Sequence, residues 1–185
     1  RHRFTFNAVY ELPFGVGRKW LASGVAGKWA GKIVGGWSLS TVTTAQSGAP
    51  FTVITQTNTT NAFSAGAQRA DVSERVSQNP NLSSSARSVA QWFNTSAFSQ
   101  PAIYRFGNEG VGILRGSGLV NVDVSLLREI RVTERIKLQI RGEFFNALNH
   151  TNLGLPGIAF GGAGFGVISS AGPARQVQVG ARIAF

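Results

Sequence analysis

The 185-residue chain contains no cysteine and no methionine, and it has only 8 acidic residues against 18 basic ones. The absence of cysteine excludes a disulfide framework and a thiolate metal site. No stretch approaches the ~20 consecutive apolar residues of a transmembrane helix, which excludes a helical membrane protein. The chain begins at Arg1 without an initiator methionine or the apolar segment of a signal peptide, so we expect a fragment or a processed product.

The sequence also lacks the short motifs of common enzymes. It contains no G-x-S-x-G turn, no Walker loop and no H-E-x-x-H pair. His2 and His150 stand apart from any His, Asp or Glu spacing that would hold a metal, and we interpret His150 as a polar loop residue. We therefore predict that the chain is not an enzyme and has no resident cofactor or metal.

The formal net charge of +10 raises the question of an anionic partner. The basic residues are dispersed, with no Lys/Arg tract and no aromatic-interleaved basic motif, which argues against a nucleic-acid partner. Arginines of the long polar regions could bind lipopolysaccharide phosphates or could simply be solvated. They are Arg69, Arg75, Arg87, Arg105 and Arg115.

Glycine is the most informative of the abundant residues, with 23 in the chain. Together with many Ser, Thr, Asn and Gln residues, this composition disfavours long helices and favours strands joined by polar turns. We predict an all-β, antiparallel fold with five strands, at residues 1–11, 33–55, 119–130, 136–147 and 176–185. The second is expected to be a single strand that kinks or bulges at Gly48-Ala49-Pro50.

Two long regions, 56–118 and 149–174, separate these strands, whereas the connections around Gly15 and Thr133 are shorter. Steps of four between apolar residues predict a weak amphipathic helix over 19–33, either interfacial or part of a glycine-rich connection. A second, short helix is expected at 86–93.

The strands alternate between apolar and polar side chains, as a sheet with one apolar and one polar face requires. Charged residues on the polar side could form a lumen wall that touches a plug or a solute, or could pair laterally and only keep a wet wall soluble. These candidate lumen-face residues are Asp123, Lys137, Arg141, Glu143 and Arg182.

Alternation alone does not separate a soluble sandwich from a transmembrane barrel. Strands of about ten residues suit a tilted membrane crossing, and the contrast between short and long connections suits the two sides of an outer membrane. The last strand ends on the aromatic Phe185, and backward counting places Tyr10 and Trp37 near the same rim. We interpret Tyr10, Trp37 and Phe185 as interface aromatics; the alternative is that aromatics cap strands in any sheet.

Six segments of the chain follow one another in a recognisable order. They are YELPFGVGRKW (10–20), GGWSLSTVTTAQSGAPFTV (35–53), WFNTSAF (92–98) with Pro101, FGNEGVGILRGSGLVNVDVSLLREI (106–130), LQIRGEFFNALNHTNLG (138–154) and PARQVQVGARIAF (173–185). With these segments in this order, the chain resembles the C-terminal portion of the Oar-like TonB-dependent outer-membrane receptors, which carry a carboxypeptidase-regulatory-like domain.

The resemblance implies a barrel of ~22 strands with a plug domain in its lumen. The chain departs from the family's RGPG at Arg115-Gly116-Ser117-Gly118. Five strands cannot close a transmembrane barrel, so we expect residues 1–185 to be the C-terminal part of the receptor barrel, without the plug and the N-terminal domains. Its last strand is the expected signal for the barrel-assembly machinery, through Val177, Val179, Gly180, Ala181, Ile183 and Phe185.

The function implied is energised nutrient uptake at the bacterial cell outer membrane, with the barrel portion supplying lumen wall and extracellular ligand-binding loops. Expected partners are outer-membrane lipid and lipopolysaccharide, the plug domain and, through it, the TonB complex. The alternative is a non-transport surface or secreted β-domain that binds anionic glycans or lipids.

Overall fold

The computed structural model describes residues 2–14, 19–20, 35–62, 66–73 and 79–185. Apart from 19–20, the amphipathic helix expected over 19–33 lies outside these residues. The described chain is built from β-strands and one short 3₁₀ helix, η2 (Thr95–Ala97), which confirms the all-β prediction. Within it, no helix is long and apolar enough to cross a membrane.

The chain divides into two compact units. The first, called the sheet unit below, comprises 2–45, 120–151 and 173–185. The second, called the loop unit, comprises 46–119 and 152–172. The two regions predicted as long connections therefore supply most of a unit with its own packing.

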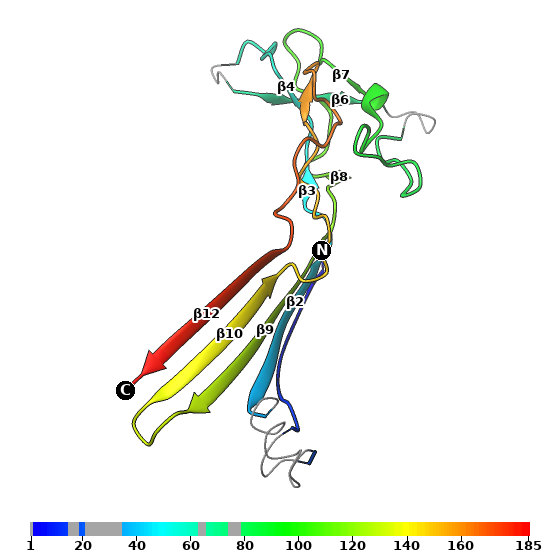
Figure 1. Ribbon diagram of the computed structural model, residues 1–185. Helices are drawn as coiled ribbons and strands as arrows, with labels where there is room; N and C mark the ends of the chain where they lie inside the picture. The colour runs from blue at the N-terminus through cyan, green and yellow to red at the C-terminus, as the bar shows by residue number, and fades with distance from the viewer. Residues whose placement is uncertain (1, 15–18, 21–34, 63–65, 74–78) are drawn as a thin grey trace. The chain divides into compact units, whose positions relative to one another are not determined.

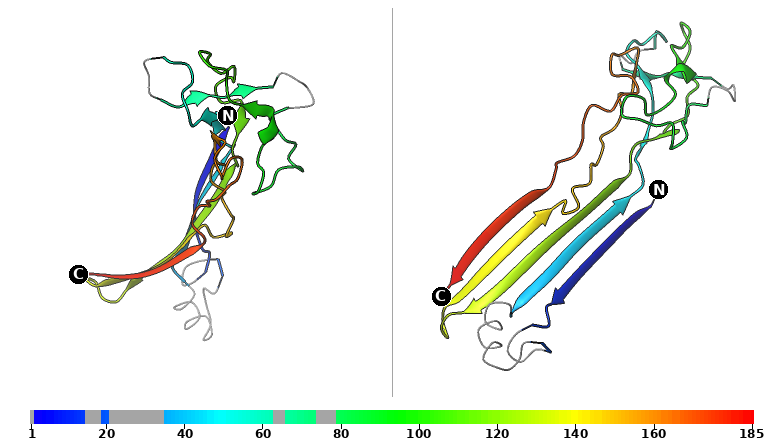
Figure 2. Two further views of the ribbon diagram at one scale, coloured as in Figure 1. Left: turned by 90° about the horizontal axis from the view of Figure 1, so that it is seen from above. Right: turned by 45° about the vertical axis from the view of Figure 1, so that its right-hand side comes forward.

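Five long strands form one sheet in the order β1-β2-β9-β10-β12. They are β1 (Arg3–Glu11), β2 (Trp37–Gln46), β9 (Leu119–Arg131), β10 (Lys137–Phe145) and β12 (Gln176–Ala184). Figure 1 labels four of them, and the right-hand view of Figure 2 shows all five side by side with neighbours running in opposite directions. Among the described strands, β1 and β12 each have a single neighbour, so both edges of the sheet are open.

A tight turn joins β9 to β10. The N–H groups of Val132 and Thr133 both donate to the carbonyl of Ile136, at 2.9 and 3.1 Å, and the Thr133 hydroxyl accepts from the N–H of Ile136 at 3.0 Å. This closure sets the antiparallel register in which Lys137 lies across from Arg131.

The prediction of a single strand over 33–55 is wrong. Residues 33–34 lie outside the described chain, and the rest divides into β2, β3 (Pro50–Phe51) and β4 (Ile54–Thr55). β3 pairs with β8 (Leu114–Arg115), and β4 pairs with β5 (Gln68–Arg69) and β11 (Ala159–Phe160). A Cβ on Gly48 would lie 1.9 Å from the Gly116 carbonyl oxygen, so the backbone packs closely here where the chain changes partners.

The loop unit has a hydrophobic core of phenylalanine and small aliphatic residues. Its buried members are Phe51, Val53, Ala70, Phe93, Ala97, Phe98 and Leu114. Phe93 lies at the centre, 5.7, 5.6 and 5.2 Å from the ring centroids of Phe51, Phe98 and Phe165. A further pair, β6 (Asp71–Val72) with β7 (Phe98–Ser99), contributes Phe98 to this core and packs Val72 against it.

The helix expected at 86–93 is also wrong. Ser88 and Gln91 exchange backbone hydrogen bonds at 3.0 and 3.2 Å, and the N–H of Trp92 donates to the carbonyl of Gly166 at 2.9 Å. A distant loop thus takes up the backbone groups that a helix would have paired locally.

Candidate functional site

The register of β9, β10 and β12 assigns their side chains to two faces, because residues directly across an antiparallel pair share a face. Leu138 lies across from Ile130 and Ile183, whereas Gln139 lies across from Glu129 and Arg182. One face is therefore apolar and the other polar. The apolar face carries Val120, Val122, Val124, Leu126, Ile130, Leu138, Ile140, Phe144, Val177, Val179, Ala181 and Ile183.

The polar face brings the predicted lumen-face residues together. Lys137, Arg141 and Glu143 alternate along β10, and their partners on β12 are Ala184, Gly180 and Gln178. Arg182 lies on the same face across from Gln139, and Asp123 joins it because it is two residues from Ser125, the partner of Glu143. Sequence alternation was sufficient to predict that all five share one face of the sheet.

Two ion pairs run along this polar face. Arg141 Nε lies 3.6 Å from Glu143 Oε2, and Lys137 Nζ lies 3.4 Å from Glu129 Oε1. The side chains of Arg141, Lys137 and Glu129 are close to half exposed. Pairs of this kind contribute about 0–1 kcal/mol to stability, so they mainly hold opposite charges beside one another on a wet surface.

Asp123 has a second role at the end of β10. Its Oδ1 accepts a hydrogen bond of 2.9 Å from the N–H of Asn146. Asn146 is 4% exposed and has φ +49°, and its amide group bonds the N–H and carbonyl of His150 and the carbonyl of Pro173. This network joins β9, the turn after β10 and the residues that lead into β12.

One charged residue interrupts the apolar face of these three strands. Arg128 lies across from Ile140, between Leu126 and Ile130 on its own strand. Its guanidinium lies 5.6 Å from the centroid of the Trp37 ring, a cation–π distance.

The three predicted interface aromatics lie at one end of the sheet. Tyr10 is near the end of β1, Trp37 begins β2, and the N–H of Leu12 donates to the Trp37 carbonyl at 2.9 Å. Phe185 follows β12 next to Ala184, which pairs with Lys137 beside the β9–β10 turn. Tyr10 is 57% exposed and Phe185 fully exposed.

The closing strand β12 presents its apolar face openly. Val177, Val179 and Ile183 are exposed, and Ala181 shares their face. Gly180 lies on the other face, across from Arg141, where a Cβ would meet nothing within 4 Å. These residues and Phe185 form an apolar, aromatic-ended edge strand.

The loop unit contains a buried acid that sequence reasoning missed. Glu109 is 1% exposed, and its two carboxylate oxygens accept from the Val53 N–H at 3.0 and 3.1 Å. Burial raises the pKa of Glu109 to about 7, against the opposing effects of the Val53 hydrogen bond and the Arg69 charge. Beside it, a Cβ on Gly107 would lie 2.1 Å from the Arg69 carbonyl oxygen, so this position requires glycine.

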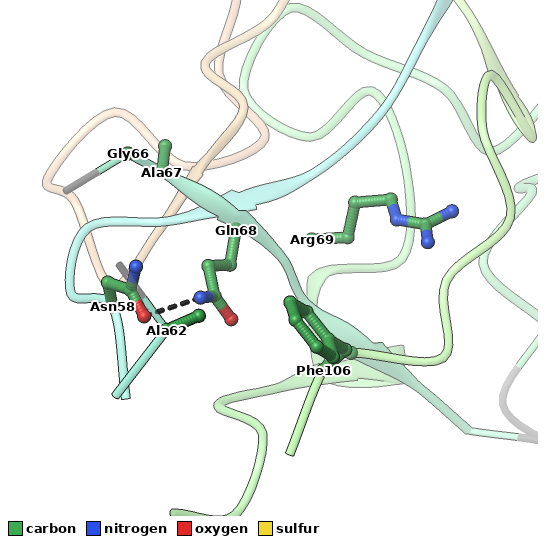
Figure 3. Close-up of a pocket in the computed structure, with 8 residues that line it drawn as sticks. Asn58, Ala62, Gly66, Ala67, Gln68, Arg69 and Phe106 are labelled. Carbon is green, nitrogen blue, oxygen red and sulfur yellow. Dashed lines mark hydrogen bonds between the residues drawn. The ribbon is translucent and has the colours of Figure 1, made fainter. Parts of the chain in front are cut away.

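A hollow of about 250 Å³ lies beside β5. It is lined by Asn58, Ala62, Gly66, Ala67, Gln68, Arg69, Phe106 and Gly107. Gln68 is held by donating from Nε2 to Asn58 Oδ1 and to Thr60 Oγ1. Figure 3 shows its amide directed toward Asn58, with the Phe106 ring on another side and the Arg69 side chain extending away from Asn58. The hollow thus combines amide groups with an exposed aromatic ring.

Three of the predicted loop arginines that the structure describes have different partners. Arg105 lies 3.5 Å from Asp71, and Arg87 lies 5.6 Å from the Trp92 ring centroid and donates to the Leu82 carbonyl. Arg115 pairs with Pro50 in the backbone ladder. Arg75 lies outside the described residues.

Arg128, Asn146 and Glu109 were not among the predicted site residues, and the sequence indicates their positions to different degrees. The alternation of β9, continued past Leu126, predicts that Arg128 lies on the apolar face. Asn146 sits in an asparagine-rich turn, the residue type that tolerates positive φ. Glu109 has no local signal, because its burial comes from Val53 and Ala70 far away in the sequence.

A family model described as an outer membrane beta barrel domain matches residues 1–178. No match was found among curated proteins or among solved structures.

Proposed function

The chain belongs to the outer membrane beta barrel domain family, and on that premise we propose that it forms the C-terminal wall of a TonB-dependent receptor. Family membership places the protein in the bacterial outer membrane. The proposed role is non-enzymatic: the polar face contributes lumen wall, and the loop unit contributes to an extracellular ligand-binding surface for energised nutrient uptake.

The observation that carries this proposal is the division of β9, β10 and β12 into an apolar and a charged face. A sheet of this kind is stable in a membrane when its apolar side faces lipid and its polar side lines a wet lumen. The ion pairs at Lys137 and Arg141 are suited to such a wall because they balance charge beside water.

The open edges of the sheet support a larger barrel. Unpaired backbone groups on β1 and β12 would be costly in lipid, and the smallest transmembrane barrels use eight strands. We propose that further strands close the barrel and that a plug domain in its lumen links it to the TonB complex. The apolar, aromatic-ended β12 is then the strand that the barrel-assembly machinery binds.

The loop unit supports the receptor part of the proposal. It is held by a phenylalanine core, so the surface it carries is structured. The hollow lined by Asn58, Gln68 and Phe106 offers hydrogen-bonding amides beside an exposed ring, groups suited to orienting a polar organic ligand.

Two observations test the proposal. The coding sequence upstream of Arg1 is expected to encode further barrel strands and a plug; a start codon and signal peptide immediately before Arg1 would contradict it. In cells, crosslinking is expected to trap the protein with TonB, and loss of TonB is expected to abolish uptake of its nutrient.

A second candidate is favoured by the compactness of the loop unit, which has its own core. A surface module that binds anionic glycans or lipids through Arg69, Arg105 and Arg115 would need such a unit but no TonB. It predicts glycan or lipopolysaccharide binding that persists without TonB and no import. Retained binding with TonB-dependent import would instead support the receptor.

A further inference from the structure

Arg128 is out of place for a lipid-facing surface. On β9, β10 and β12, the apolar face carries a single charged side chain, and it is Arg128. The seven other charged residues of these strands lie on the polar face: Asp123, Glu129, Arg131, Lys137, Arg141, Glu143 and Arg182. A cation facing lipid is costly near the bilayer centre and far less so near the interface.

The position of Arg128 along its strand resolves this conflict. It lies three residues before Arg131, the last residue of β9, which is about 10 Å along the strand. Because a barrel strand is tilted, the depth of Arg128 below the end of β9 is less than this distance along the strand. An arginine side chain is long enough to carry its guanidinium from there to headgroup level.

The guanidinium of Arg128 lies beside the Trp37 ring. The Ser38 hydroxyl lies 3.5 Å from the Leu127 carbonyl, and a Cβ on Gly36 would lie 3.6 Å from the Glu129 carbonyl. These two distances show that Ser38 lies near Leu127 and Gly36 near Glu129, so Trp37 and Arg128 lie across from one another on neighbouring strands. The guanidinium lies 5.6 Å from the ring centroid. Tryptophan favours headgroup depth, so the pair combines a cation with an interfacial ring.

We propose that Arg128 and Trp37 form a binding site for the phosphodiester group of a phospholipid. The terminal N–H groups of a guanidinium are planar donors that match two phosphate oxygens, and the indole would pack beside the glycerol backbone. The pair lies at the end of the sheet that carries the short β9–β10 turn, the periplasmic side of an outer-membrane barrel. The occupant is therefore a phospholipid of the periplasmic leaflet, rather than lipopolysaccharide.

This inference rests on the proposed function in one respect only, the assignment of the apolar face to lipid. It requires neither a plug nor TonB. Nutrient uptake that persists without TonB would remove the transport proposal and leave this site standing. Failure of the tests below would remove the site and leave transport standing.

The test uses the whole protein purified in detergent, titrated with phosphatidylglycerol and followed by native mass spectrometry. Arg128→Gln is expected to weaken binding of the first phosphatidylglycerol about tenfold, and Arg128→Lys to weaken it less. Arg182→Gln, which removes a charge from the polar face, is the matched control and is expected to leave that binding unchanged. Arg128→Lys keeps the charge but lacks the planar arrangement of donors. An affinity between those of wild type and Arg128→Gln would therefore indicate phosphate recognition, because a folding defect would not follow the charge of the side chain.

Two further probes identify the source of the phosphate. Diacylglycerol, which lacks the phosphate, is expected to bind wild type and Arg128→Gln equally weakly, and inorganic phosphate is expected not to compete with phosphatidylglycerol. The proposal is overturned if Arg128→Gln binds phosphatidylglycerol like wild type, if diacylglycerol binds as tightly, or if inorganic phosphate or another protein chain takes the site.

Discussion

The backbone N–H of Asn146 donates to Oδ1 of Asp123 at 2.9 Å, which joins the turn after β10 to the neighbouring strand β9. The same asparagine bonds His150 twice and Pro173 once through its side chain. A residue predicted only as lumen wall therefore also anchors the turn from which the chain proceeds toward β12.

Asn146→Ala is expected to lower the free energy of unfolding by about 2–4 kcal/mol, because three part-buried hydrogen bonds to His150 and Pro173 are lost and alanine must adopt φ +49°. The measurement is the denaturant midpoint of the folded protein in detergent. Asn149→Ala is the matched control, since Asn149 has φ +52° but its side chain accepts one bond, from the N–H of Arg175. Equal losses in the two variants would show that strain, and not the network, determines stability here.

The raised pKa of Glu109 makes the loop unit sensitive to pH. Between about 4.5 and about 7 the folded unit binds more protons than the unfolded chain, so its stability falls as pH rises through this window. Glu109→Gln keeps the hydrogen-bond acceptor for Val53 but does not titrate. The variant is expected to abolish this pH dependence and to be about 1–3 kcal/mol more stable than wild type above pH 7.

Hydrogen exchange at residues 50–55 measures this effect, because the Val53 N–H donates to the Glu109 carboxylate. After correction for intrinsic exchange, wild-type protection is expected to decline from pH 5 to pH 7 and the Glu109→Gln profile to stay flat. The control is Glu134→Gln, at an exposed residue of the β9–β10 turn. A wild-type profile without slope would contradict the raised pKa.

Gly107→Ala is expected to destabilise the loop unit by a few kcal/mol, because the new methyl group would overlap the Arg69 carbonyl. Moving the backbone aside would break the hydrogen bond from the Glu109 N–H to the Ala70 carbonyl. Limited proteolysis of the folded protein reports the change as faster cleavage within 66–110.

Gly164→Ala provides the comparison, since a Cβ there meets nothing within 4 Å. Its effect is expected to stay within about 0.5 kcal/mol. Equal cleavage rates in the two variants would contradict the close packing of Gly107 against β5.

The sequence was sufficient to predict β1, β9, β10 and β12 because period-two alternation is a local signal. The hairpin of β9 and β10 and the closing strand β12 lie within one or two residues of the expected bounds. The predicted strand 33–55 failed because strand propensity continues past Gln46 while the pairing partner changes, from β9 to β8 and then to β5 and β11.

The loop unit could not be derived from the sequence because its contacts are distant. Phe93 packs on Phe51 and Phe165, and the Trp92 N–H bonds Gly166, so no local pattern records the core. The same holds for Glu109. Arg128 is different, since continuing the alternation of β9 by two residues places it on the apolar face.

The central claim is that the apolar face of the sheet contacts lipid and the polar face contacts water. The chain has no native cysteine, so single-cysteine variants along β12 can carry a spin label without background. In outer-membrane vesicles, labels at Val177, Val179 and Ile183 are expected to collide mainly with lipid-soluble oxygen, and labels at Gln178, Gly180 and Arg182 mainly with a water-soluble nickel complex. Uniform accessibility to the nickel complex at all six positions, without alternation, would contradict the account.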